Sequence, residues 1–128
     1  MNTSDIITFL SSTDAHIEQS LRYLIHESFN DNIETYLIDD ILSPLLSLTD
    51  NFDNEFLLRL VFWVVKNFTA GSGNARKIFS ENEMHVKLIE ALRQAVQVDL
   101  LVICCDAVMN MAQDGLENEY VSFYRTSS

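Results

Sequence analysis

The sequence predicts an all-α protein that folds as a short right-handed helical solenoid. The 128 residues include only three Gly and one Pro, whereas an all-β fold needs frequent turns. One apolar segment, residues 56–71, is long enough for about four helical turns. Similar segments recur at intervals of about 40 residues, which is a period of helical repeat proteins. We therefore expect about two and a half to three stacked helical repeats.

The composition limits the classes of function. A chain of this length is expected to form one domain. The net charge of −11 argues against binding to nucleic-acid phosphates and to anionic membrane surfaces. The chain shows no signal peptide and no apolar run that could span a bilayer, so we expect an intracellular protein of the cytoplasm, the nucleus or both.

The N-terminal half contains four short helical segments before the long apolar one. Capping residues precede an apolar helix at 6–10, and apolar residues then recur at helical spacing from 15 to 29. One or two turns are expected at 33–38. A further apolar segment at 41–48 carries Pro44 near its start, where the missing N–H costs little.

The long segment 56–71 is apolar around almost its whole circumference, so we expect a helix that is buried on several sides. Its length favours a helix, although Val61 to Val65 could also form a buried strand. Gly71 is expected to end the helix, because Gly readily adopts the left-handed conformation found at many helix ends.

The C-terminal half continues with a short helix at 75–79. Ser80 is expected to cap the next helix, with Glu83 at capping-box spacing. A helix over residues 99–113 should end at Gly115. We divide the chain into a helical domain, residues 1–115, and a C-terminal tail, residues 116–128, that either caps the body or is flexible.

Three segments align as the longest helix of successive repeats: residues 21–29, 61–69 and 104–112. Their equivalent positions Glu27, Asn67 and Asn110 are 40 and 43 residues apart. Around these positions the chain resembles the armadillo-repeat family over residues 4–115. Residues 64–72 and 107–112 look like ends of the family's third helix, and residues 40–46 look like a second helix with its proline. The usual Gly between the first and second helices is absent, and Asp40 and Glu83 stand near its place.

The resemblance implies a binding scaffold whose third helices line a groove for an extended peptide. Trp63 and Asn67 reproduce a pair that the nuclear-import adaptors of this family, the importin-alpha proteins, carry in their groove. Residues four apart share a helix face, and an Asn amide can both donate to and accept from a peptide backbone. The implied peptide-binding ladder consists of Tyr23, Glu27, Trp63, Asn67, Asp106 and Asn110.

This ladder mixes aromatic, amide and acidic groups, which suits a segment that bears Lys or Arg. Arg59 and Lys66 lie on the same helix and weaken the site for a basic ligand. In the alternative interpretation, Trp63 belongs to the core and Asn67 stabilises the repeat. A nuclear-import function would need more than one Trp–Asn pair.

Other functions have less support in the sequence. His16, His26 and His85 are scattered, so we expect no metal site and no cofactor. The adjacent Cys104 and Cys105 do not form a disulfide framework, and their apolar surroundings predict burial rather than nucleophilic chemistry. We therefore expect a non-enzymatic module that binds a protein or peptide. The alternatives are a homo- or hetero-oligomer formed through exposed solenoid ends and, from a different class, a small helical enzyme or regulatory subunit.

Overall fold

The computed structural model describes the backbone of residues 3–28 and 40–127, and side chains up to Gln113. Within these residues the chain is entirely helical, with seven helices and no strand. The turns expected at 33–38 lie outside the described residues. The helices are α1 (Thr3–Leu10), α2 (Asp14–Glu27), α4 (Leu42–Leu48), α5 (Glu55–Gly71), α6 (Gly73–Glu81), α7 (Met84–Gln94) and α8 (Val98–Ser127).

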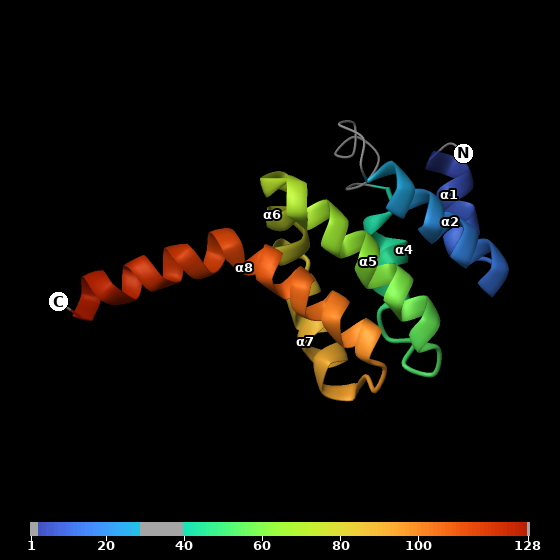
Figure 1. The fold of residues 1–128 in the computed structure, drawn as a ribbon. Coiled ribbons are helices and arrows are strands. Elements are labelled where there is room, and N and C mark those ends of the chain that lie inside the picture. The colour runs from blue at the N-terminus through green and yellow to red at the C-terminus, as the bar shows by residue number, and fades with distance from the viewer. Residues whose placement is uncertain (1–2, 29–39, 128) are drawn as a thin grey trace.

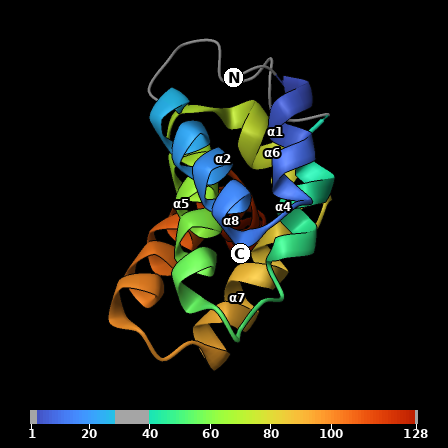
Figure 2. The same ribbon diagram turned by 90° about the vertical axis from the view of Figure 1, so that its right-hand side faces the viewer.

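The helices form two layers. In one layer α2, α5 and α8 lie side by side and run in the same direction, with α5 in contact with both of its neighbours (Figure 1). The shorter helices α1, α4, α6 and α7 form the second layer, which covers one side of the first (Figure 2). The three long segments that align in the sequence are therefore neighbours in space.

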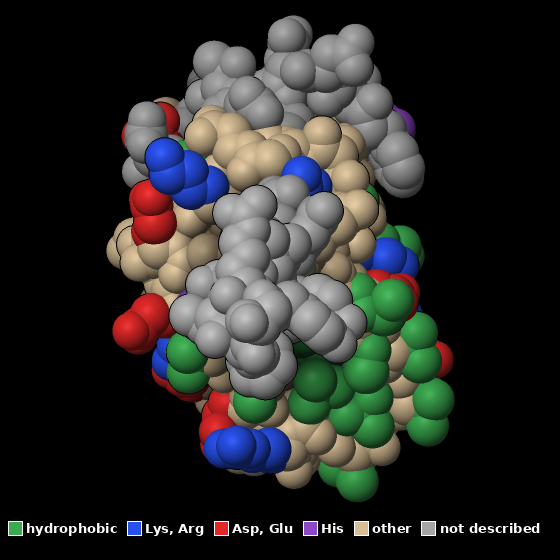
Figure 3. All heavy atoms as spheres, turned by 90° about the vertical axis from the view of Figure 1, so that its left-hand side faces the viewer, with side chains coloured by type: hydrophobic (Ala, Val, Ile, Leu, Met, Phe, Trp, Pro, Cys, Tyr) green, Lys and Arg blue, Asp and Glu red, His purple; other side chains and the backbone are tan. Residues whose placement is uncertain are grey.

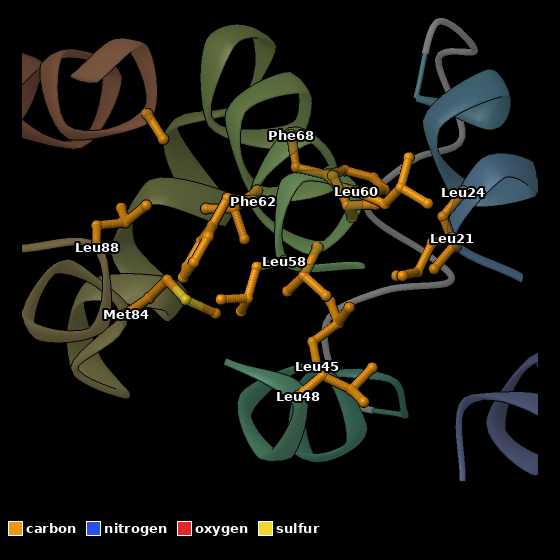
Figure 4. Close-up of a cluster of buried hydrophobic side chains, with 14 of the residues drawn as sticks. Leu21, Leu24, Leu45, Leu48, Leu58, Leu60, Phe62, Phe68, Met84 and Leu88 are labelled. Carbon is orange, nitrogen blue, oxygen red and sulfur yellow. The ribbon is translucent and has the colours of Figure 1, made fainter. Parts of the chain in front are cut away.

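Helix α5 forms the centre of the hydrophobic core, as its apolar sequence predicts. Nine of its residues are buried, among them Phe62 and Phe68. Leucines of α2 and α4 and Met84 and Leu88 of α7 meet this helix from different sides (Figure 4). Length rather than residue type decides between helix and strand here, because 17 residues far exceed a typical strand.

Helix starts in the first layer are fixed by capping side chains. The side chain of Asn54 accepts a hydrogen bond from the backbone N–H of Leu57 at 3.2 Å, which satisfies one free donor at the start of α5. One Glu55 carboxylate oxygen accepts the backbone N–H groups of Val96 and Gln97 at 3.0 Å each. The first residue of α5 therefore also holds the turn that leads into α8.

Two predicted helix boundaries are wrong. Ser80 lies inside α6 instead of capping α7, and α7 instead follows Glu83, whose φ is 61° and whose side chain makes no capping hydrogen bond. A tight left-handed turn between α6 and α7 replaces the predicted capping box. Gly115 does not end α8, which continues to Ser127. A Gly inside a helix costs only about 1 kcal/mol relative to Ala, and no Pro follows to stop the helix.

No helix in the described part of the chain combines the length and the hydropathy that a bilayer crossing requires.

We expect Phe62→Ala to lower the free energy of unfolding by about 3–5 kcal/mol, because it leaves a cavity at a fully buried position of α5. Urea denaturation followed by circular dichroism measures this loss. Phe62→Leu is the matched control, since it keeps much of the apolar volume and should cost clearly less. Equal stability of Phe62→Ala and the parent protein would contradict the placement of this ring in the core.

Candidate interaction surface

The two predicted ladder amides connect neighbouring helices of the first layer. The Asn67 side-chain nitrogen donates to the Ser28 hydroxyl at 2.8 Å, which joins α5 to the end of α2. The Asn110 side-chain nitrogen donates to the backbone carbonyl of Lys66 at 3.0 Å, which joins α8 to α5. Asn67 thus makes the kind of contact that the alternative interpretation gives it, and Asn110 makes a similar one. One N–H of each amide is used within the protein.

The predicted acidic residue of α8 has a cation as its neighbour. The Lys66 ammonium lies 3.2 Å from a carboxylate oxygen of Asp106. Both side chains are about one-third exposed or more, at 34% and 42%, so water screens the pair and its contribution to stability is small. The pair nevertheless neutralises the carboxylate that a basic ligand would need.

Trp63, one of the two aromatic members of the ladder, is also in contact with a cation. Trp63 is partly buried and packs against the core, and the Arg59 guanidinium carbon lies 5.9 Å from the centre of its ring. The same guanidinium lies 5.3 Å from the ring of Phe56, and Arg22 of α2 approaches that ring at 5.8 Å. We call Arg22, Phe56, Arg59 and Trp63 the cation–aromatic cluster.

The two arginines of this cluster differ in their acidic partners. The Nε of Arg22 forms an ion pair with a carboxylate oxygen of Glu18 at 3.0 Å. Arg59 has no carboxylate within ion-pair distance among the residues that the structure describes, and it is only partly exposed. Phe56 is 43% exposed, which is a large fraction for an aromatic side chain beside a charged group. A guanidinium with free donors therefore lies next to exposed apolar area.

Tyr23 and Glu27, the remaining members of the predicted ladder, lie on α2. Both are half-buried, and both interact with other groups of the protein. Tyr23 packs against the core. The structure thus brings the six predicted residues onto one layer of helices, but it engages at least the two amides and the Asp106 carboxylate in internal contacts.

Sequence reasoning missed Phe56 and Arg22 as surface residues. Phe56, Arg59 and Trp63 are three and four residues apart, so their spacing on one face of α5 was visible in the sequence. No local signal identifies Arg22, because its contact with Phe56 depends on how α2 packs against α5.

The histidines form no ligand cluster. His16 stacks on Phe9 with ring centres 4.5 Å apart, and all three histidines are exposed. Within the described residues no group of three or more His, Cys, Asp or Glu side chains is arranged to hold a metal ion.

The prediction that both cysteines are buried is wrong for one of them. Cys104 is fully buried, but Cys105 is exposed. Consecutive residues of a helix point about 100° apart, so only one of the two can face the core. Burial, together with the neighbouring Cys105 thiol, raises the pKa of Cys104 to about 12.

Comparison of the chain with protein-family models, with curated proteins and with solved structures gives no match.

We expect one cysteine thiol of the native protein to react quickly with a thiol reagent and the other to react slowly. With a pKa of about 12, Cys104 is thiolate in only about one molecule in 10⁴ at pH 8, and it is also shielded from reagents. Titration with an aromatic disulfide reagent should therefore modify Cys105 quickly and Cys104 only after denaturation. Cys105→Ser should abolish the fast phase. Two equally fast thiols would contradict the burial of Cys104.

Proposed function

We propose that this protein is a non-enzymatic interaction module of armadillo type, which binds an extended segment of a partner protein across α2, α5 and α8. The repeat spacing of about 40 residues and the parallel arrangement of these three helices support the fold assignment. In an armadillo solenoid, such a layer lines the binding groove.

One observation carries the functional part of the proposal: Arg59 is held between two aromatic rings without an acidic partner among the described residues. A guanidinium presents several N–H donors in a plane and binds carboxylates with two parallel hydrogen bonds. The rings of Phe56 and Trp63 exclude water on their side, which strengthens such a bond. The cation–aromatic cluster therefore suits a carboxylate that is flanked by apolar side chains.

The charge of Arg59 also acts against a basic ligand. Arg22 and Lys66 are paired with Glu18 and Asp106, whereas Arg59 has no acidic partner among the described residues. Like charges in an interface oppose binding, so Arg or Lys side chains of a ligand would be repelled there. An acidic segment fits this surface better than the basic segment that the ladder suggests, and better than the basic signals of nuclear import.

The residue types of the cluster are those that contribute most to protein interfaces. Arg and Trp are enriched among residues whose truncation costs binding energy, and such residues gather near the centre of an interface. In this proposal Asn67 and Asn110 have a different role: their hydrogen bonds fix the spacing of α2, α5 and α8. The cluster, rather than the amide ladder, makes the principal contacts with the partner.

A selection from a random peptide library displayed on phage tests the proposal. We expect the selected peptides to share an Asp or Glu next to an apolar residue. Arg59→Gln should weaken the binding of a selected peptide about 10–100-fold, because a charged hydrogen bond contributes about 1.5–3 kcal/mol. Fluorescence anisotropy measures this loss, and added salt should weaken binding to the parent protein.

Arg93→Gln provides the matched control, since it removes the same charge from the exposed surface of α7. It should leave peptide affinity within about twofold, which is about 0.4 kcal/mol in binding free energy. Selection of Lys- and Arg-rich peptides would contradict the proposed specificity. Equal effects of the two substitutions would show that the cluster is not the binding site.

A further inference from the structure

Helix α8 carries exposed apolar side chains on the face that turns away from the core. Val98 and Met109 are each 70% exposed, Val102 is 53% exposed, and Cys105 is exposed as well. These four residues are separated by four, three and four positions, the spacing that keeps side chains on one helix face. We call them the α8 apolar stripe. They lie on the part of α8 whose opposite face is buried in the core.

The stripe belongs to a wider apolar surface. Hydrophobic side chains gather in the lower right of Figure 3, where Figures 1 and 2 place the N-terminal half of α8. Phe56 is the one large hydrophobic residue of the described chain that is strongly exposed outside α7, α8 and the turn between them. Single apolar residues on a protein surface are ordinary, whereas a continuous row marks a binding surface.

Contacts between α5 and α8 fix which residues lie at the same level on these two parallel helices. The Glu55 carboxylate accepts the backbone N–H of Gln97, which is 42 positions further along the chain. The Lys66 carbonyl accepts from the Asn110 side chain, which is 44 positions further along. A residue of α5 is therefore level with the residue about 43 positions later in α8.

This register places Val102 beside Arg59 on the neighbouring helix. Both side chains reach the surface, since Arg59 is partly exposed and Val102 is 53% exposed. Packed helices have axes about 8–10 Å apart. The α8 apolar stripe therefore adjoins the cation–aromatic cluster, and the two form one surface.

The charges on α8 favour an uncharged ligand group at the stripe. Asp99 is exposed three positions before Val102, and Asp106 follows four positions after it. Lys66 neutralises Asp106, but it leaves Asp99 to repel a second acidic side chain. A second copy of this chain fits the stripe less well, because it would bring another Asp99 and another net charge of −11 to the same place.

We propose that the α8 apolar stripe is a second subsite of the peptide surface, and that it takes an apolar side chain of the segment whose acidic side chain binds Arg59. This inference rests on the proposed function. It adds a position, a residue class and a spacing to the partner: an acidic residue over α5 and an apolar residue over Val102 of α8.

The distance between the helices selects a spacing of three residues in the partner. In the polyproline II conformation, side chains point the same way every three residues, which are about 9 Å apart at 3.1 Å per residue. This length matches the 8–10 Å between helix axes. In a β-strand, the nearest residues on one side are two apart and span only about 6.6 Å. The partner segment therefore crosses from α5 to α8 as a polyproline II helix.

Peptides selected on the parent protein by phage display test the spacing. An apolar residue should recur three positions from the acidic residue. Replacing it by Ala in a selected peptide should weaken binding about tenfold in fluorescence anisotropy, because less apolar area is buried. Selected peptides that carry a second acidic residue at this position would contradict the proposal.

Val102→Asn tests the subsite from the side of the protein. It should weaken the selected peptide about tenfold, and it changes no charge beside Arg59. Circular dichroism should show an unchanged fold, since the position is exposed. Val86→Asn is the matched control, because Val86 is 49% exposed but lies on α7, and it should leave affinity within about twofold. Added salt should reduce the effect of Arg59→Gln but not that of Val102→Asn.

Combining the protein and peptide substitutions tests direct contact. With Val102→Asn, the Ala substitution in the peptide should cause little further loss, whereas removal of the peptide's acidic group should still weaken binding about 10–100-fold. Additive effects of Val102→Asn and the peptide Ala substitution would overturn the α8 subsite.

The outcomes separate this inference from the proposed function. Peptides that respond to Arg59→Gln but not to Val102→Asn would overturn the α8 subsite and leave the proposed function standing. Peptides that respond to neither would overturn both. Light scattering covers the remaining occupant: a parent dimer that Val102→Asn dissociates would show that a second copy covers the stripe, which would also overturn the subsite.

Discussion

Burial of α5 between α2 and α8 is the constraint on which the rest of the structure depends. A helix that is apolar around most of its circumference cannot be stable in water alone, so other helices must cover it. α2 and α8 cover its two sides, and the shorter helices cover the inner face. Hydrogen bonds from Asn67 and Asn110 then fix the relative positions of the three long helices.

The part of α5 that remains uncovered determines the chemistry of the surface. Phe56, Arg59 and Trp63 lie along this edge. The neighbouring helix adds Arg22, which is paired with Glu18. Among the described residues, Arg59 is therefore the cation beside these rings that has no acidic partner.

Much of the helical pattern could be predicted because it depends on local signals. The apolar length of α5 and the capping residues before it fixed this helix to within one residue. The start of α7 and the end of α8 could not be predicted, since a left-handed Glu83 and a helical Gly115 depend on the surrounding structure. For the surface, the spacing placed Trp63 and Asn67 on one helix. Packing between distant segments brings Asn67 to Ser28 and Arg22 to Phe56. These two contacts therefore have no local signal in the sequence.

Native-state hydrogen exchange measured residue by residue tests the central claim, that the other helices assemble around α5. We expect the backbone amides of α5 between Leu60 and Phe68 to be the slowest in the protein and to exchange only through global unfolding. Amides of α1 and of the C-terminal part of α8 should exchange through local opening. Faster exchange in α5 than in α7 would contradict the claim, because it would place the most stable unit elsewhere.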